Sequence, residues 1–220
     1  PTSQMSLKAC IYDLDGVITD TAKYHYQSWK WVADQLEYHL TEKQNQKLKG
    51  VGRKESLEKI IKWSGNRISE AYKQRYLLKK NAMYLEFIDT MTPDEVFPGF
   101  KEFNDALKVQ GIKVAIGSSS RNAIRIIDKL DLVLEFHAIV DGGMTENSKP
   151  EPDIFLLAAE KLQCDPSECL VIEDSQAGLT AAKKAGMKSI LYGEDKGLKG
   201  AHLQIDDWSK ADLEKFKTLF

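Results

Sequence analysis

Short apolar runs alternate with helical patterns over much of the chain. The first run, Leu7–Leu14, is nearly continuous and ends among acidic residues. A short run of this kind is typical of a strand buried in a parallel sheet. Similar runs lie at Lys113–Gly117, Ala138–Val140, Leu170–Ile172 and Ser189–Tyr192, and helical patterns between them cover Phe100–Val109, Ala123–Leu130, Ile154–Leu162 and Gly178–Ala185. The alternation predicts an α/β domain built on a parallel sheet, with ligands bound beyond the carboxyl ends of the strands.

Residues 20–90 carry a different pattern, in which helical periodicity continues without a strand-like run. Apolar positions at helical spacing are Trp29, Val32, Ala33, Leu36, Leu57, Ile60, Ile61, Tyr72, Tyr76, Met83 and Phe87. This pattern predicts an all-helical insert. We therefore expect a core domain formed by residues 1–19 and 91–220, and a helical cap domain formed by residues 20–90. Pro93 and Pro98 interrupt helix at the second junction, so the two connecting segments could act as a hinge.

The composition is that of an ordinary globular protein, and it narrows the class of partner. The chain has 220 residues, of which 42% are hydrophobic and 29% charged, and its net charge is −2. A balanced charge gives no reason to expect nucleic acid or an anionic membrane as partner. No apolar run approaches the roughly 18 residues of a membrane span, and the N-terminus lacks a signal-peptide pattern, so we expect a cytoplasmic protein. We also expect a monomer whose three cysteines, which lack CxxC spacing, are free thiols.

Charge is distributed unevenly between the two predicted domains. Residues 20–90 contain 14 Lys and Arg against 9 Asp and Glu, whereas the rest of the chain contains 17 against 24. A basic cap over an acidic core suits an anionic substrate that is bridged by a cation. The alternative interpretation is that these charges only coat solvated helix faces.

Two aspartates end the first apolar run. Asp13 and Asp15 are two residues apart, so both side chains would point the same way if the strand continued. Two carboxylates this close need a cation or a shared proton. One of them could attack a phosphorus atom while the other gives and takes a proton. The alternative is a pair of turn aspartates after a strand, with no chemical role.

Three later segments place polar groups after predicted strands. Gly117–Asn122 (GSSSRN) opens a helix, where hydroxyls, backbone amides and the helix dipole could hold phosphate oxygens, although helix capping alone explains such residues. Lys149, held out of helix by Pro150, could neutralise a phosphoryl group, although most loop lysines are only solvated. Glu173 and Asp174 end a further strand, and together with the first aspartates they could hold one Mg²⁺.

A parallel sheet would bring all four segments to one edge, where they would supply a nucleophile, a phosphate cradle, a lysine and metal ligands. With the motifs DLDGV, SSS, KP and EDS and a helical insert after the first of them, the chain resembles the haloacid dehalogenase superfamily over essentially its whole length. This resemblance implies a Rossmann-like parallel-sheet core with an inserted helical cap. It also implies phosphoryl transfer that depends on one Mg²⁺ per chain.

The first half of the insert narrows the resemblance further. Residues 13–25 and Lys49–Ser56 (KGVGRKES) closely resemble the β-phosphoglucomutase branch of the superfamily. Such an isomerase interconverts β-D-glucose 1-phosphate and glucose 6-phosphate through an aspartyl-phosphate enzyme and a β-glucose 1,6-bisphosphate intermediate. A sugar phosphate is therefore the expected partner.

The resemblance implies a role for each candidate residue. Asp13 is the nucleophile, Asp15 is the general acid and base, and Ser118 and Lys149 bracket the transferring phosphoryl group. The implied metal ligands are Asp13, Asp15 through its backbone carbonyl, Glu173 and Asp174, and the implied substrate-binding residues are Thr21, His25, Lys49, Gly50, Arg53, Lys80, Ser120, Arg121 and Asn122. The resemblance also implies a cis peptide bond between Lys149 and Pro150.

Two other functions stay open on the same scaffold. A sugar-phosphate phosphatase would use water instead of a sugar hydroxyl as acceptor and needs only one phosphate site, so Arg53 and His25 would be dispensable for its chemistry. A non-catalytic phosphosugar-binding protein would tolerate the loss of Asp13 or Asp15, and both are present. Fold alone does not separate these three functions.

Overall fold

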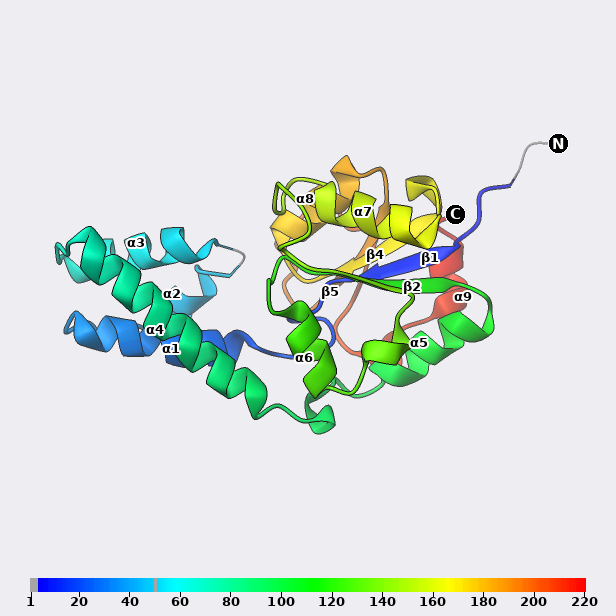
Figure 1. Cartoon of the computed structure of the whole chain (residues 1–220). Coiled ribbons are helices and arrows are strands. Elements are labelled where there is room, and N and C mark those ends of the chain that lie inside the picture. Colours follow the sequence, from blue (N-terminus) through cyan, green and yellow to red (C-terminus); the bar gives the residue numbers. More distant parts are fainter. Residues whose placement is uncertain (1–3, 50) are drawn as a thin grey trace. The chain divides into compact units, whose positions relative to one another are not determined.

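The larger part of the chain is built on one six-stranded parallel sheet (Figure 1). The computed structural model describes residues 4–49 and 51–220. The strands are β1 (Ala9–Tyr12), β2 (Lys113–Gly117), β3 (Ala138–Val140), β4 (Cys169–Glu173), β5 (Lys188–Tyr192) and β6 (Leu203–Ile205), in the order β3-β2-β1-β4-β5-β6. Every neighbouring pair is parallel. The predicted α/β fold is confirmed.

Helices cover both faces of this sheet, with α7 and α8 on one face and α5 and α6 on the other (Figure 1). The helices of this part are α5 (Phe100–Val109), α6 (Ala123–Lys129), α7 (Asp153–Leu162), α8 (Gln176–Lys184) and α9 (Leu213–Lys217), with short 3-10 helices at Pro93–Glu95, Val133–Glu135, Pro166–Glu168 and Trp208–Lys210. The central strands β1 and β4 are buried at every position. Burial on both faces explains why these strands read as continuous apolar runs instead of alternating ones.

Some elements differ from the sequence-based expectation. β1 is shorter than Leu7–Leu14, and it ends before Asp13. The edge strand β6 and the helix α9 were not predicted from the sequence. β6 has three residues, of which only Ile205 is buried, and α9 has five residues, so neither is long enough to give a clear periodic signal.

The described residues up to Asp20 form one compact unit with Thr92–Phe220, and Thr21–Met91 form a second. The second unit contains the helices α1 (Ala22–Gln35), α2 (Glu42–Gln46), α3 (Arg53–Ser64) and α4 (Glu70–Asp89), and no strand among its described residues. The predicted all-helical insert is therefore confirmed. Its core is formed by residues that include Trp29, Val32, Leu57 and Ile60.

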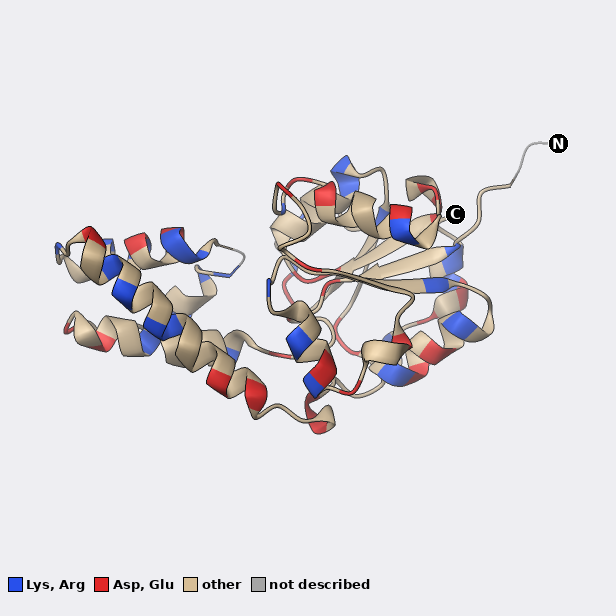
Figure 2. Ribbon diagram, viewed as in Figure 1, with Lys and Arg blue, Asp and Glu red and all other residues tan. Residues whose placement is uncertain are grey.

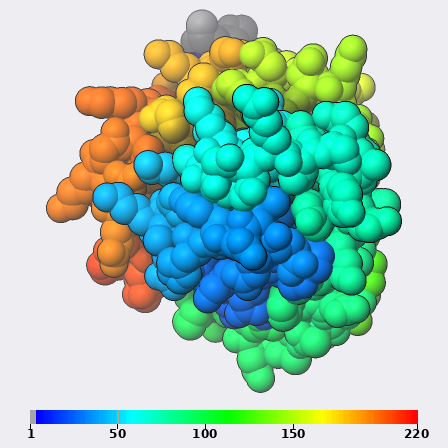
Figure 3. All heavy atoms as spheres, turned by 90° about the vertical axis from the view of Figure 1, so that its left-hand side faces the viewer, coloured from blue at the N-terminus to red at the C-terminus, as the bar shows by residue number. Residues whose placement is uncertain are grey.

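The helical unit is rich in charged residues, most of which are exposed. Lys and Arg are spread along α3 and α4 (Figure 2). Figure 3 shows the surface of the unit in blue to green, where long side chains of the cyan stretch around α3 project outward. The apolar stripes of α1, α3 and α4 face the core of the unit, and most of the charged residues face solvent.

A glycine turn and two hydrogen bonds from distant segments shape the loop that follows β1. Gly16 turns the chain at a φ of +79°, a conformation that favours glycine. Beyond the turn, the Phe97 N–H donates to Ile18 O at 2.7 Å, and the Trp208 indole Nε1 donates to Val17 O at 2.9 Å. Trp208 is only 2% exposed, so its hydrogen bond to Val17 is buried. This bond anchors the loop that carries the first two aspartates to the C-terminal segment.

We expect Trp208→Phe to lower the free energy of unfolding by about 2 kcal/mol. The change leaves the Val17 carbonyl without its donor and removes ring volume from a buried site. Urea denaturation followed by circular dichroism would measure the loss. Trp63→Phe is the control, because Trp63 is only partly buried at the edge of the helical core. A loss no larger than that of the control would show that Trp208 does not anchor the loop.

No helix among residues 4–49 and 51–220 is both long and apolar enough to cross a membrane. The cysteines Cys10, Cys164 and Cys169 are all free thiols, as predicted. Cys10 and Cys169 are buried on the neighbouring strands β1 and β4. Burial raises the pKa of Cys169 to about 12, so this thiol stays protonated near neutral pH.

Candidate active site

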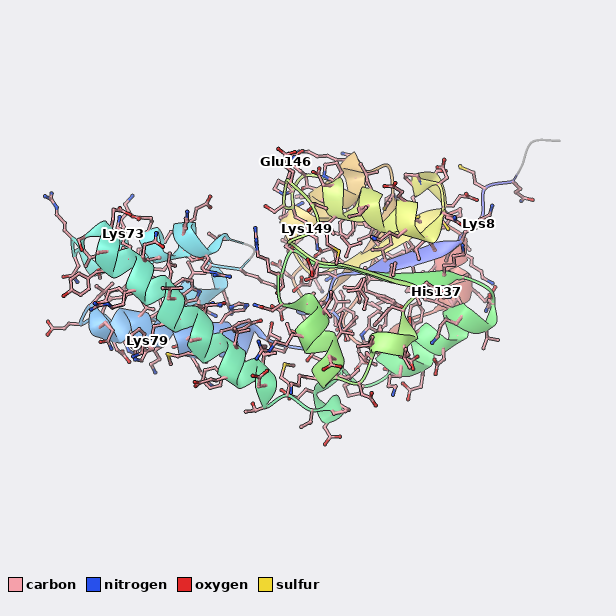
Figure 4. The ribbon with its side chains drawn as sticks, viewed as in Figure 1. Lys8, Lys73, Lys79, His137, Glu146 and Lys149 are labelled. Atoms are coloured by element: carbon pink, nitrogen blue, oxygen red, sulfur yellow. The ribbon has the colours of Figure 1, made fainter. Side chains whose placement is uncertain are left out.

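The ammonium group of Lys149, which Figure 4 labels, lies between two carboxylates at the carboxyl end of the sheet. Asp13 directly follows β1, and its Oδ1 accepts a hydrogen bond of 3.1 Å from Lys149 Nζ. The same Nζ donates to Glu173 Oε1 at 2.6 Å and to Gly117 O at 2.9 Å. The side chains of Lys149 and Glu173 are 6% and 0% exposed. Four residues from four segments far apart in the sequence are thus joined at one nitrogen atom.

The electrostatics of this cluster favour a further cation. Burial raises the pKa of Asp13 to about 6, with Lys149 opposing the rise and Asp174 adding to it. Burial also raises the pKa of Glu173, and the charge of Asp13 acts in the same direction. Burial alone would lower the pKa of Lys149, but Asp13 and Glu173 outweigh it and raise that pKa above its ordinary value. One ammonium does not balance this many carboxylates, so a cation would stabilise their charged forms.

The acidic residues fit a hard divalent cation. Oxygen atoms of Asp13, Glu173 and Asp174 all lie within 4.8 Å of one another. A Cβ on Gly16 would lie 2.0 Å from Asp174 Oδ2, and a Cβ on Gly178 would lie 1.9 Å from Glu173 Cδ. Only glycine at these two positions leaves room for the carboxylates. An all-oxygen donor set of this kind suits Mg²⁺.

Glu173 is anchored by several hydrogen bonds besides the one from Lys149. Its Oε2 accepts hydrogen bonds from the backbone N–H of Asp174 at 2.9 Å, from the backbone N–H of Ser175 at 3.1 Å and from Ser175 Oγ at 3.1 Å. Since its other oxygen binds Lys149, both oxygens have fixed partners. The Glu173 carboxylate therefore links Lys149 to the residues that precede α8.

The aspartate pair is arranged differently from the strand-based expectation. β1 ends at Tyr12, so the alternation of a strand does not govern where the Asp15 side chain points. Asp15 instead pairs with Thr19 across the turn at Gly16. The carboxylates of Asp13 and Asp15 are thus positioned by different backbone structures, a strand end and a turn.

The serine-rich segment forms a tight turn after β2. Ser118 is 2% exposed, and its Oγ accepts a hydrogen bond of 3.1 Å from the backbone N–H of Ser120. Ser120 Oγ in turn accepts one of 3.0 Å from the backbone N–H of Asn122. Gly142 approaches so closely that a Cβ there would lie 2.0 Å from Ser119 O. Arg121, the remaining candidate of this segment, is exposed.

The candidates of the helical unit form a second group. Lys80 Nζ lies 2.9 Å from His25 Nδ1. Arg53, at the first position of α3, is exposed, and it lies close enough to lower the pKa of both groups. Thr21 is buried and directly precedes α1. Lys49 is exposed.

Gly50, the remaining candidate, lies outside the described residues. Among these candidates, His25 and Lys80 are in direct contact. The sequence alone did not predict this contact.

Several residues of the site were not found from the sequence. Phe155 lies beneath Lys149, with its ring centroid 4.8 Å from Lys149 Nζ, and nothing in the helical pattern of α7 distinguishes it from ordinary core. Gly178 could have been suspected, since it stands three residues after Ser175, which caps α8 by accepting from its N–H. The Lys149–Pro150 bond is cis, as predicted.

The chain is similar to known proteins over most of its length. The chain is 42% identical over 210 residues to the β-phosphoglucomutase of Bacillus subtilis. The alignment covers 94% of this chain and 93% of the relative. It is 32% identical over 190 residues to a phosphorylated carbohydrates phosphatase of Thermotoga maritima, with 85% of each chain covered.

Solved structures extend this similarity to the fold. The crystal structure of β-phosphoglucomutase from Clostridium difficile superimposes with a TM-score of 0.87 at 37% identity, and 96% of each chain is covered. A profile of haloacid dehalogenase-like hydrolases matches residues 7–186. The chain therefore belongs to the haloacid dehalogenase-like hydrolase family.

Proposed function

We propose that this chain is a β-phosphoglucomutase, which interconverts β-D-glucose 1-phosphate and glucose 6-phosphate. The observation that carries the proposal is the Asp13 carboxylate at the end of β1, bound to Lys149 beside two further acids. The identity of 42% with a β-phosphoglucomutase, over nearly the full length of both chains, supports this substrate over others.

The first half-reaction transfers a phosphoryl group to the enzyme. An Asp13 oxygen attacks phosphorus, forming an O–P bond as the bond from phosphorus to the donor oxygen breaks. Lys149 balances negative charge on Asp13 and on the transferring group, and Ser118 adds a hydroxyl near the same atoms. Asp15 gives its proton to the departing donor oxygen.

The second half-reaction runs the same steps backward on a different hydroxyl. Asp15, now a carboxylate, removes the proton from a sugar hydroxyl, and that oxygen takes the phosphoryl group from Asp13. A bisphosphate forms and returns one of its phosphates to the enzyme after its two ends exchange places. Two phosphate sites are needed for this exchange, which a phosphatase does not require.

We propose the following contacts to the phosphate that is not transferred. Ser120, Arg121 and Asn122 in the turn after β2 and Arg53 at the start of α3 offer hydroxyl, amide and guanidinium donors. Thr21, His25, Lys49, Gly50 and Lys80 complete the proposed contacts to the sugar phosphate.

The proposed cofactor is one Mg²⁺. The carboxylates of Asp13, Glu173 and Asp174 would hold it, together with the backbone carbonyl of Asp15. When bound, the ion would neutralise charge on the phosphoryl oxygens. A monomeric state and a cytoplasmic location are further proposals from the sequence.

One assay separates the proposed mutase from the phosphatase that the Thermotoga relative represents. The protein is incubated with Mg²⁺, β-glucose 1-phosphate and a trace of β-glucose 1,6-bisphosphate, and both glucose 6-phosphate and inorganic phosphate are measured. Glucose 6-phosphate is the expected main product. Release of inorganic phosphate at the same rate as substrate loss would favour the phosphatase.

A substitution at Arg53 tests the second phosphate site. We expect Arg53→Ala to lower mutase turnover by at least about 10²-fold, or roughly 2.7 kcal/mol of transition-state stabilisation, because a guanidinium suits bidentate capture of the phosphate that is not transferred. Hydrolysis of acetyl phosphate, which has no second phosphate, should change little. Steady-state kinetics on both substrates would measure the two effects.

Arg67→Ala is the matched control, because Arg67 is another exposed arginine of the helical unit with no proposed contact. It should leave both reactions unchanged. If Arg53→Ala lowered both activities equally, or neither, Arg53 would not bind the second phosphate.

A further inference from the structure

A buried lysine in the helical unit lacks the partner that such a lysine usually has. Lys80, on α4, is only 4% exposed. Lysine is almost never buried to this extent unless a carboxylate pairs with it. In the described part of the chain, Lys80 has no ion pair with Asp or Glu, and the only charged group that perturbs it is the cation Arg53.

Two aromatic rings lie next to the Lys80 ammonium, where a buried lysine usually has a carboxylate. Lys80 Nζ lies 4.7 Å from the ring centroid of Trp29 and 4.9 Å from that of Tyr84. Trp29 and Tyr84 are 4% and 2% exposed. A ring face attracts an ammonium group electrostatically, and more strongly where water is excluded. The rings thus hold the cation in place but supply no countercharge. We call Trp29, Tyr84 and Lys80 the aromatic box.

The aromatic box also fixes His25. The His25 ring stacks on Tyr84, with centroids 4.0 Å apart and planes 14° from parallel, and its Nδ1 lies 2.9 Å from Lys80 Nζ. A charged Lys80 donates to Nδ1 only if His25 is neutral there. Tyr84 therefore orients both members of this pair through its ring.

In the described part of the chain, the charged groups that shift the pKa values of this pair are cations, Arg53 for both groups and Lys80 for His25. α1 contributes His25 and Trp29, α3 contributes Arg53, and α4 contributes Tyr84. Burial and the nearby Arg53 lower the pKa of Lys80 to about 7. Burial, Lys80 and Arg53 lower the pKa of His25 below its ordinary value. An anion that entered this environment would find a positive potential that no residue of the box cancels.

The spacing of these residues places the aromatic box and His25 on one face of each of two helices, α1 and α4. His25 and Trp29 are four residues apart on α1, and Lys80 and Tyr84 are four apart on α4. Residues four apart lie on the same face of a helix, and α1 and α4 run side by side (Figure 1).

We propose that Trp29 and Tyr84 are positioning residues for the sugar-phosphate reaction: their rings hold the Lys80 ammonium against His25 without a protein carboxylate, so that the anionic ligand supplies the countercharge. This inference rests on the proposed function, because the anion is the phosphate-bearing sugar. An ammonium already paired with a carboxylate would have to give up that partner on binding. An ammonium held by aromatic rings has no carboxylate partner to give up, so its attraction to the phosphate is not offset by the loss of an ion pair.

The test compares two substitutions of Trp29. Trp29→Phe keeps a ring face over Lys80, whereas Trp29→Leu removes it and keeps the site apolar. We expect kcat/KM for β-glucose 1-phosphate to fall about tenfold in Trp29→Leu and less than about threefold in Trp29→Phe. Lys80 acts as a cation, which is lost as pH rises through its pKa. Removing the ring lowers that pKa, so the alkaline limb of the kcat/KM profile should move to lower pH in Trp29→Leu.

A second measurement does not depend on turnover. Lysine labelled with ¹³C at Cε reports the charge of Lys80 in an NMR titration, with the signal assigned from Lys80→Gln. We expect a lower pKa for Lys80 in Trp29→Leu than in Trp29→Phe or the wild type. Adding glucose 6-phosphate should raise the pKa of Lys80 in all three, since a nearby anion favours the charged lysine.

Trp31→Leu is the matched control. Trp31 also lies on α1, and Lys79 Nζ stands 5.4 Å from its ring centroid, but Lys79 is exposed (Figure 4). The control removes the same ring from a lysine of the same two helices. It should shift neither the pH profile nor the Lys80 signal.

Two results would overturn the inference. If Trp29→Leu folded normally and kept the wild-type pH profile and Lys80 titration, the box would be core packing only. If Trp29→Phe and Trp29→Leu behaved alike, the ring face would not be the cause. Should the wild type fail to convert β-glucose 1-phosphate, the proposed function would fail, while the NMR titrations would still decide whether the box holds and tunes Lys80.

Discussion

Replacing Asp13 by asparagine is expected to lower mutase turnover by at least about 10³-fold, or roughly 4 kcal/mol of transition-state stabilisation. An amide cannot attack phosphorus, and it cannot contribute its share of negative charge to a metal site. Conversion of β-glucose 1-phosphate, followed with a coupled assay for glucose 6-phosphate, would measure the loss. Labelling with radioactive acetyl phosphate would show whether the chain can still take up a phosphoryl group.

Asp15→Asn is the matched control, because it makes the same chemical change two residues away. It should also slow turnover, by about 10²–10⁴-fold, since proton transfer is lost. Mg²⁺ affinity should fall in Asp13→Asn but not in Asp15→Asn, whose proposed metal contact is a backbone carbonyl. Equal loss of metal affinity in both variants, or phosphoryl uptake by Asp13→Asn, would contradict this division of roles.

Replacing Lys149 by methionine should reduce both turnover and stability. The ammonium donates to Asp13 and Glu173 from a nearly buried position, so its loss leaves two carboxylates without their cation. We expect turnover to fall about 10³-fold, because a preorganised charge on the transferring group is lost. The free energy of unfolding should fall by about 3 kcal/mol in the presence of EDTA.

Magnesium should recover part of that stability, since a bound cation compensates the same carboxylates. Urea denaturation with EDTA and with Mg²⁺ would measure both effects. Lys184→Met is the control: Lys184 pairs with Glu151 at 2.8 Å, but these side chains are 45% and 49% exposed, so a loss of less than about 0.5 kcal/mol is expected. If Lys149→Met lost no more than the control, the buried pair would not stabilise the site.

The sequence by itself determined the fold class. Strands such as Lys113–Gly117 and Ala138–Val140 were predicted at their observed bounds, because a strand covered on both faces must be apolar at nearly every position. The helical insert was equally clear, since its three longer helices, α1, α3 and α4, each bury one stripe. β6 and α9 were not predicted, because an edge strand with one buried residue and a five-residue helix need little apolar surface.

The sequence also determined which residue types gather at the carboxyl end of the sheet. Asp13, Lys149 and Glu173 follow three segments that a parallel sheet brings to one edge, so their proximity follows from topology alone. What topology does not fix is the hydrogen bonding between them. That Lys149 binds both acids, while Phe155 lies beneath it, depends on how α7 packs against the sheet.

Only the tertiary structure decided the surroundings of Lys80. Helical spacing places His25 with Trp29 and Lys80 with Tyr84, but it cannot say that these two faces meet. Packing of α1 against α4 brings the four side chains together and excludes water and carboxylates from the ammonium. The physical reason is that local pattern specifies which face of a helix is buried, whereas the charge environment of a buried group is set by neighbours that are distant in the sequence.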